Sequence, residues 1–315
     1  MALRETIRPL TPEGAHPSLG LGCAPIGNLY APVSERAAEA TVEEAYGRGI
    51  RFFDTAPHYG AGVSEVRLGR ALAGVDRDTV SIATKIGRRI VDTDGRTVPA
   101  GGTGADTVGD LSRDGVLRSL EGSLRRLDTD RVDLLYLHDP ADVDEALAGA
   151  LPALIELRDE GVVRAVGVGM VHTKPLHRYV CEAPIDVVMP AGRLTLLDRS
   201  ARGALVPAAR QRGVGLVAAG VYNSGILVDP RGAPYFDYRP AEPAVVARAL
   251  ELEAACERHG VRLSDAATRW PLREPAVDAV VIGARTEAEV AAFHDGFDTP
   301  IPDALWHELE PLGLL

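Results

Sequence analysis

The sequence predicts an α/β protein of the (β/α)8 TIM barrel class, and three observations carry this prediction. Short apolar runs alternate with amphipathic helical patterns along the whole chain. Eight such runs are present, and each is followed by a helical pattern, as in a barrel of eight parallel strands. The runs are rich in Val, Ile and Leu without strict polar alternation, which is typical of strands covered on both faces.

The predicted strands are short and are taken here in chain order. They cover residues 19–22, 52–54, 80–85, 132–138, 163–168, 185–189, 214–219 and 279–282. Parallel neighbours of this kind need a crossover between them, and the helical patterns supply it.

The predicted helices begin and end at recognisable residues. Ser34 is suited to cap a helix that stops near Gly49, and Ser112 is suited to cap a second helix with an apolar stripe. Further helical faces recur at residues 64–73, 143–160, 201–212, 242–259 and 286–295. The pattern over residues 173–182 is weaker because two prolines crowd it.

A doubly wound sheet is the competing fold. It needs a glycine-rich fingerprint after its first strand, but here Pro25 stands where the helix should open. The glycine-rich stretch 100–110 follows no strand directly and lacks the Lys-Ser/Thr of a nucleotide cradle, so we expect a mobile surface loop over the barrel mouth. No shift in composition marks a boundary, which predicts a single domain over residues 1–315.

Composition excludes several function classes. The 315 residues are 46% hydrophobic and 25% charged, and the formal net charge is −11. Such a chain repels phosphate backbones and anionic bilayers, so neither nucleic acid nor membrane is an expected partner. Three scattered cysteines without a CxxC pair, and an N-terminus without a continuous apolar stretch, predict a cytoplasmic protein.

Four polar side chains fall where a barrel places its active site, at the carboxyl ends of the strands. Asp54 ends the second predicted strand, Lys85 the third and His138 the fourth, and Tyr59 lies five residues after Asp54. Each alone is open to a structural explanation, such as a turn or a rim residue. Together they are harder to dismiss, because buried Lys and His at the ends of apolar strands need partners.

These four groups form a coherent set for proton transfer. A tyrosine of ordinary pKa is a poor proton carrier at neutral pH, whereas a nearby ammonium lowers that pKa and a carboxylate holds the ammonium in place. A neutral imidazole can orient a carbonyl or alcohol oxygen toward the phenol. The set therefore suits proton transfer at a carbonyl or alcohol, paired with hydride transfer by a nicotinamide.

The segments FFDTAPHYG, ATKIG and DLLYLHDP resemble the catalytic segments of the aldo-keto reductase superfamily. The resemblance spans nearly the whole chain and implies a barrel that binds a nicotinamide without a Rossmann fold. It assigns Asp54, Tyr59, Lys85 and His138 as the catalytic tetrad.

The segments GLGCAPIGNLY, AVGVGM, AGRLTLLD and YNSGIL resemble the sugar-oxidising branch, which includes aldose, L-fucose and L-galactose dehydrogenases. This implies oxidation of a sugar at its anomeric carbon to a lactone, with Tyr59 as the general acid/base.

The resemblance also implies where the cofactor binds. The implied positions are Gly22, Met170, Asn223, Ser224, Gly225, Leu227, Ile282, Gly283, Ala284, Arg285 and Glu289. NADP-preferring relatives carry Lys and Arg where Gly283 and Glu289 stand here. A carboxylate repels a 2′-phosphate and accepts hydrogen bonds from ribose hydroxyls, so we expect NAD to be preferred, with NADP possible through Arg285.

Three departures from the family pattern concern the nicotinamide. Val171 stands where this branch has an asparagine that holds the carboxamide, Ala191 near the place of a glutamine, and Ala219 near the place of a stacking aromatic. Two alternatives therefore stay open: an NAD(P)H-dependent carbonyl reductase, and a non-catalytic cofactor-binding regulatory barrel.

The expected partner is a small sugar or carbonyl substrate, and the expected oligomeric state is a monomer or a homodimer. No metal is expected, because no HxH or HExxH spacing accompanies His58, His172 and His177.

Overall fold

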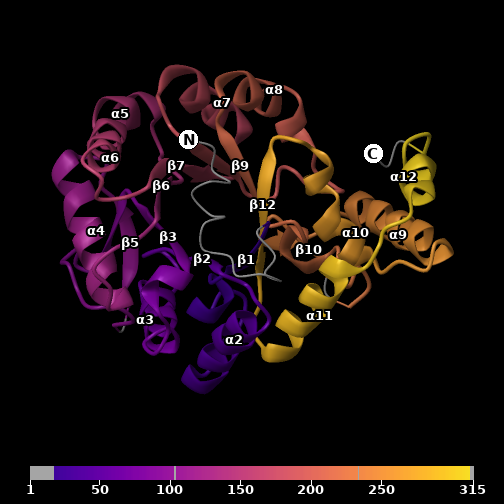
Figure 1. Cartoon of the computed structure of the whole chain (residues 1–315), viewed down its shortest axis with the longest axis horizontal. Helices are drawn as coiled ribbons and strands as arrows, with labels where there is room; N and C mark the ends of the chain where they lie inside the picture. The colour runs from indigo at the N-terminus through magenta and orange to yellow at the C-terminus, as the bar shows by residue number, and fades with distance from the viewer. Residues whose placement is uncertain (1–17, 103, 233, 313–315) are drawn as a thin grey trace.

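A computed structural model describes residues 18–102, 104–232 and 234–312. Its eight parallel strands close into a barrel in the order β1-β12-β9-β8-β7-β6-β3-β2 (Figure 1). The barrel strands are β1 (Leu19–Gly22), β2 (Phe52–Asp54), β3 (Ser81–Ile86), β6 (Leu134–His138), β7 (Ala165–Met170), β8 (Val187–Pro190), β9 (Gly215–Ala219) and β12 (Val277–Gly283). The (β/α)8 prediction is confirmed. Residues 1–17, in which no signal segment is expected, lie outside the described residues.

The helices form a ring around the barrel, as Figure 1 shows. They are α2 (Glu35–Gly47), α3 (Val63–Ala71), α4 (Arg113–Leu127), α5 (Val143–Ala148), α6 (Ala150–Asp159), α7 (Thr173–Glu182), α8 (Leu205–Arg212), α9 (Pro243–Arg258), α10 (Leu263–Arg269), α11 (Glu287–Asp298) and α12 (Asp303–Leu309). The last helix, α12, packs on α9 at one side of the molecule. No helix in the described part of the chain combines the length and apolar character needed to cross a membrane.

The two predicted serine caps are present. Ser34 Oγ accepts a hydrogen bond from the Ala37 amide at 3.2 Å, and Ser112 Oγ accepts one from the Gly115 amide at 3.0 Å. Each bond satisfies an amide group at the first turn that has no partner within its own helix. The first of these helices ends at Gly47, slightly before the predicted stop.

One helix prediction needs correction. The expected helix over 143–160 is two helices broken at Gly149, where a Cβ would lie 2.6 Å from the Leu111 carbonyl oxygen. The weaker pattern over 173–182 is confirmed as a helix with the same bounds; Pro175 lies in its first turn, where a missing N–H costs no intrahelical bond. Helices α10 and α12 were not predicted; α10 packs against α11 in the ring.

The expectation that residues 100–110 form only a surface loop also needs correction. The end of this stretch forms a strand, β5 (Asp106–Gly109), which pairs antiparallel with β4 (Arg88–Val91). The Asp110 amide donates to the Gly87 carbonyl at 2.9 Å and closes the base of this hairpin. A second small hairpin joins β10 (Tyr235–Phe236) to β11 (Arg239–Pro240) after β9. Both insertions follow the carboxyl ends of barrel strands.

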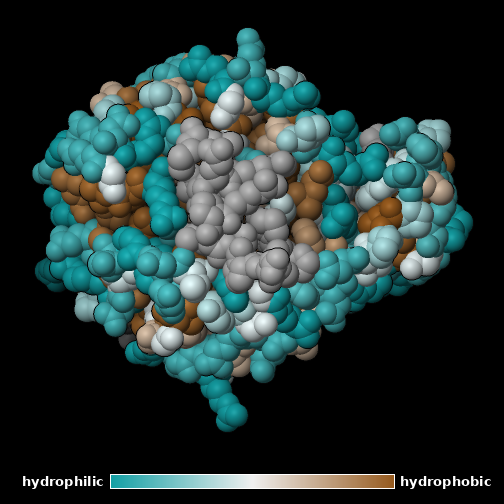
Figure 2. All heavy atoms as spheres, viewed as in Figure 1, coloured by the Kyte–Doolittle hydropathy of each residue, from teal (hydrophilic) through white to brown (hydrophobic). Residues whose placement is uncertain are grey.

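The core has two parts. One fills the barrel interior with side chains such as Phe52, Leu134 and Val187, and the other lies between the strands and the helices. In the face shown in Figure 2, hydrophilic residues predominate over the outer helices. Because the barrel interior is apolar, polar side chains that reach it do so at the ends of the strands.

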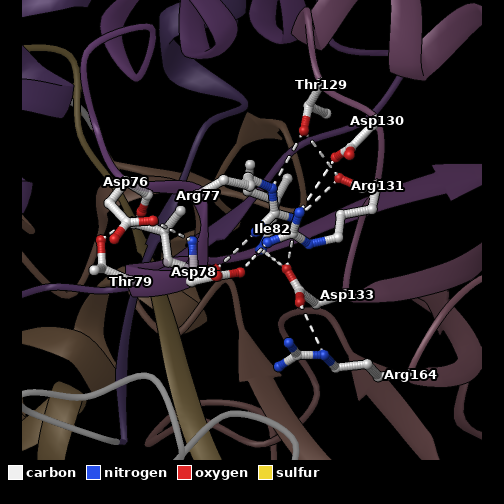
Figure 3. A network of polar contacts seen from close by, with 11 residues as sticks. Asp76, Arg77, Asp78, Thr79, Ile82, Thr129, Asp130, Arg131, Asp133 and Arg164 are labelled. Atoms are coloured by element: carbon white, nitrogen blue, oxygen red, sulfur yellow. Dashed lines mark hydrogen bonds and ion pairs between the residues drawn. The ribbon is translucent and has the colours of Figure 1, made fainter.

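A polar network ties the strands together at their amino ends (Figure 3). Asp133, which precedes β6 and is 1% exposed, accepts the Ile82 amide at 2.9 Å and the Arg77 guanidinium at 2.7 Å. Its other oxygen lies 3.4 Å from Arg164 Nε. Asp186, which precedes β8, accepts the Val166 amide in the same way at 2.9 Å. Asp133 thus uses both of its carboxylate oxygens.

Candidate active site

Three of the four predicted catalytic side chains leave the carboxyl ends of adjacent strands. Asp54 is the last residue of β2, Lys85 the last but one of β3, and His138 the last of β6. In the barrel β2, β3 and β6 are consecutive neighbours. All three side chains are buried, so the closed sheet itself fixes their separation.

Tyr59 comes from the loop after β2, and close backbone contact holds this loop. Gly60 has a φ of 63°, and a Cβ there would lie 2.2 Å from the Gly27 carbonyl oxygen. The loop that follows β1 therefore packs directly on the loop that carries Tyr59. Only glycine satisfies both the left-handed conformation and this approach.

Asp54 and Lys85 form a buried ion pair. Lys85 Nζ donates to Asp54 Oδ1 at 2.6 Å and to the Thr55 carbonyl at 2.9 Å. The second carboxylate oxygen, Asp54 Oδ2, is buried and has no hydrogen-bond partner in the described residues. Burial raises the pKa of Asp54, and the Lys85 charge opposes that rise.

The Lys85 ammonium lies over the face of the Tyr59 ring, 4.8 Å from its centroid. The net shift of the Tyr59 pKa is nevertheless upward, against the expectation from the sequence. Burial, followed by the charges of Asp54 and Asp139, raises that pKa well above its ordinary value. Tyr59 is therefore a protonated phenol at neutral pH in this arrangement, with a cation against its ring.

His138 faces Tyr59 edge to face, with ring centroids 5.6 Å apart. Burial, helped by the charges of Lys85 and Arg88, lowers its pKa well below the ordinary value, so the imidazole is neutral. Its Nδ1 atom is buried and has no partner in the described part of the chain. The four predicted residues therefore meet at one end of the barrel, where Asp54 Oδ2 and His138 Nδ1 are buried without a hydrogen-bond partner in the described residues.

His58, beside Tyr59, adds a second imidazole to this group. Its ring lies 5.7 Å from that of His138, and its Nδ1 is 2.6 Å from Thr107 Oγ1 on β5. Sequence reasoning missed Thr107, because only the hairpin pairing of β4 and β5 brings it to the mouth. No group of three His, Cys, Asp or Glu side chains suited to a metal gathers within the residues described.

The predicted cofactor residues lie in two groups, one of which follows β12. Gly22 pairs with Gly283 across β1 and β12, so no side chain projects between the two strand ends. Ile282 and Ala284 are buried, whereas Arg285 is exposed. Arg285 NH2 pairs with Glu289 Oε1 at 2.7 Å, and the Arg285 amide donates to Glu289 Oε2 at 2.8 Å.

The second group follows β9. Asn223, Ser224 and Gly225 have successive positive φ angles of 46°, 61° and 104°, and Leu227 is buried beneath them. Asn223 Nδ2 donates to the Gly192 carbonyl at 3.2 Å, while its buried Oδ1 has no partner among described atoms. That free acceptor, and strand ends without side chains, fit a dinucleotide rich in hydroxyl and amide donors.

The same loop also reaches across the mouth. Ser224 Oγ accepts the Tyr238 amide at 3.0 Å, and Tyr238 stacks on Tyr30 with centroids 6.0 Å apart. Asp237 accepts Arg193 NH2 at 2.8 Å. Sequence reasoning missed this arrangement, because it depends on contacts between the loops that follow three different strands.

Backbone contacts hold the three positions at which the sequence departs from the expected family pattern. Met170 ends β7 and is buried. The Val171 amide donates to Asp139 Oδ1 at 3.2 Å, and its carbonyl accepts Arg193 Nε at 2.7 Å. Ala191 and Ala219 form a β-bridge. Arg193 thus fixes the backbone at Val171, where the branch has an asparagine side chain.

Comparison with known proteins gives a consistent result. Residues 18–313 match the Aldo/keto reductase family. The chain is 40% identical to a D-threo-aldose 1-dehydrogenase of Pseudomonas sp, over 96% of this chain and 95% of the relative. It is 38% identical to a pyridoxal 4-dehydrogenase of Microbacterium luteolum, over 95% and 94%.

An L-galactose dehydrogenase of Arabidopsis thaliana is 32% identical, over 87% of this chain and 82% of the relative. Among solved structures, an aldo-keto reductase from Bacillus halodurans in its holo form superposes with a TM-score of 0.74 at 26% identity, covering 94% of this chain and 91% of that one. The resemblance to the sugar-oxidising branch is confirmed by the first and third relatives.

Proposed function

The chain belongs to the aldo/keto reductase family and is an NAD(P)-dependent oxidoreductase, and from this premise we propose that it oxidises the anomeric carbon of an aldose to a lactone. The observation that carries the proposal is the cluster of Tyr59, Lys85, Asp54 and His138 at the carboxyl end of the barrel. The dehydrogenases named above act on two sugars and on pyridoxal. Aldoses, and pyridoxal through its neighbouring hydroxymethyl group, can all close to cyclic hemiacetals, whose oxidation yields lactones.

We assign the acid/base role to Tyr59. In oxidation the phenolate oxygen takes the proton of the anomeric hydroxyl as the C–O bond becomes a carbonyl. The Lys85 ammonium against the ring stabilises the phenolate, and Asp54 holds that ammonium in place. The neutral His138 donates a hydrogen bond that orients the reacting oxygen toward Tyr59.

A nicotinamide supplies the hydride acceptor when it is bound. We propose that the loop residues Asn223, Ser224 and Gly225, with the end of β12, hold the cofactor, and that NAD is preferred. Glu289 supports this preference because its carboxylate already neutralises Arg285, the only cation near the end of β12 that the sequence offered for a 2′-phosphate.

The test is turnover of NAD and NADP with a sugar panel of L-fucose, L-galactose and D-arabinose, with pyridoxal as a fourth substrate. Formation of reduced cofactor is followed by absorbance, and a lactone product is identified by mass. Turnover that Tyr59→Phe abolishes supports the proposal. Cofactor binding without oxidation of any hemiacetal contradicts it.

Carbonyl reduction is a second candidate, and one observation favours it. Tyr59 is protonated at neutral pH, which is the state needed to donate a proton to a carbonyl oxygen. Reduction of an aldehyde panel with NADH and NADPH, faster at pH 7 than any oxidation, is the result that would support it.

A further inference from the structure

A turn after β3 places an arginine at the mouth of the barrel. Gly87 has a φ of 93°, and a Cβ there would lie 2.7 Å from Leu137 Cδ1, so the position accepts only glycine. This turn takes the chain from the strand that carries Lys85 directly into β4, which begins at Arg88. Arg88 therefore starts the hairpin only three residues after a proposed catalytic group.

The hairpin register shows which way Arg88 faces. In the β4–β5 pair Arg88 lies opposite Gly109, and Ile90 lies opposite Thr107. Residues that face each other, or are two apart on one strand, share a face of the ribbon. Thr107 on this face touches His58, and a Cβ at Gly62 would lie 2.8 Å from Ile90 Cδ1. The face that carries Arg88 thus lies against the loop of His58 and Tyr59.

Arg88 is half-buried, and its side chain has no partner among the described residues. Its Nε atom is buried without a hydrogen bond, and no carboxylate among the described residues pairs with its guanidinium. A Cβ at Gly109, opposite, would meet nothing within 4 Å, so the space beside Arg88 is open. Its charge is near enough to both imidazoles to lower the pKa of His58 and His138, after burial, which is the main cause for each.

An arginine with free donors at an open site is suited to bind ligand oxygens. The surrounding charge favours a neutral ligand, because Asp106 and Asp139 also face His58 and offset the guanidinium. Thr107 occupies His58 Nδ1, which leaves Nε2 for a ligand. The neighbouring Arg89 differs: it lies on the other face of the ribbon and donates to the Gly95 carbonyl at 3.1 Å.

We propose that Arg88 and His58 form a substrate subsite that binds hydroxyl groups of a neutral polyhydroxylated substrate, away from the reacting carbon. The inference rests on the proposed function, since it names how this active site recognises a sugar. In this subsite Arg88 supplies paired N–H donors, and His58 supplies its ring nitrogen Nε2, because Thr107 already bonds Nδ1.

The test compares Arg88→Met with Arg89→Met as the matched control. In the reducing direction, kcat and KM are measured for glyceraldehyde and for propanal, which lacks the hydroxyls. We expect Arg88→Met to lower kcat/KM for glyceraldehyde about ten- to a hundredfold, mainly by raising KM. The same variant should change kcat/KM for propanal by no more than about twofold. Arg89→Met should change neither, and NADH affinity measured by fluorescence should stay unchanged in both.

Three results would overturn the subsite: an equal loss for both aldehydes, an equal effect of the two arginine variants, or a larger loss for a uronic acid than for the neutral aldose. Arg88→Lys, which keeps the charge, should recover part of the lost affinity, and thermal unfolding checks that each variant is folded. If the proposed sugar oxidation is wrong, the wild-type enzyme already fails to oxidise the sugars. If the subsite is wrong, Arg88→Met leaves the ratio of kcat/KM for glyceraldehyde to kcat/KM for propanal unchanged. The two failures are therefore distinguishable.

Discussion

Asp133 and Asp54 are both buried aspartates paired with cations, but they lie at opposite ends of the barrel. At the amino end, Asp133 accepts hydrogen bonds from a backbone amide and a guanidinium, with a second arginine beside it (Figure 3). At the carboxyl end, Asp54 uses one oxygen for Lys85 and leaves the other without a partner. A buried acceptor left unpaired costs about 1–3 kcal/mol, so Asp54 carries a cost that Asp133 avoids.

The two ends therefore have different tasks. The satisfied carboxylate of Asp133 fixes the strands, whereas the free oxygen of Asp54 remains available to a ligand. His138 Nδ1 and Asn223 Oδ1 resemble Asp54 Oδ2, since all three atoms are buried at the carboxyl end and have no hydrogen-bond partner among the described residues. Substitutions at the two ends should separate activity from stability.

The largest effect is expected for Tyr59→Phe. Loss of the hydroxyl removes the proposed acid/base group, so kcat/KM should fall about 10²- to 10⁴-fold. The melting temperature should stay within a few degrees of the wild type, because the ring and its contact with Lys85 remain. Steady-state kinetics and thermal unfolding measure the two quantities. Retention of more than a tenth of the activity would remove Tyr59 from the proposed role.

Asp133→Asn should have the converse effect. It removes the charge between Arg77 and Arg164, and breaking a buried pair costs about 3–5 kcal/mol. We expect this loss in the free energy of unfolding, measured with urea, while kcat per folded molecule stays near the wild-type value.

Asp54→Asn is the matched variant at the other end. It leaves the buried Lys85 ammonium without its charge partner, so a loss of about 3–5 kcal/mol in the free energy of unfolding is expected here too. The two variants should differ in kcat, which falls for Asp54→Asn because Lys85 loses the carboxylate that holds it in place. Equal kcat values per folded molecule for the two aspartate variants would contradict the different roles of the two ends.

The pH dependence of oxidation should follow Tyr59. Because burial raises the pKa of the phenol, the deprotonated base is scarce at neutral pH and its fraction rises about tenfold per pH unit below that pKa. We expect kcat/KM for oxidation to rise toward alkaline pH, whereas carbonyl reduction should change little over the same range, because the phenol stays protonated below its pKa. Initial rates between pH 6 and pH 10 measure this, and a flat oxidation profile would contradict it.

The smallest effect is expected at the end of β12. Glu289→Gln removes the charge that neutralises Arg285, which frees the guanidinium for a 2′-phosphate. The ratio of kcat/KM for NADP to that for NAD should rise about threefold to tenfold, as expected for an exposed ion pair worth about 1 kcal/mol. An unchanged ratio would show that Arg285 does not bind the 2′-phosphate of NADP.

The sequence predicted the barrel well because each strand is a continuous apolar run, and the end of a run also marks where a side chain enters the mouth. Asp54, Lys85 and His138 followed from that rule alone. Thr107 and His58 are 49 positions apart in the sequence. Their contact depends on the β4–β5 hairpin, which the local hydrophobic pattern does not predict. The Arg193–Asp237 pair was missed for the same reason, and α10 because its pattern is too short to stand out.

The β4–β5 hairpin leaves and re-enters the barrel at a single point, where the Asp110 amide meets the Gly87 carbonyl. A segment whose ends adjoin in this way can be lengthened or replaced without moving the strands on either side. We therefore expect that exchanging this hairpin between related enzymes alters substrate preference through Arg88, while Asp54, Tyr59, Lys85 and His138 of the recipient keep their positions.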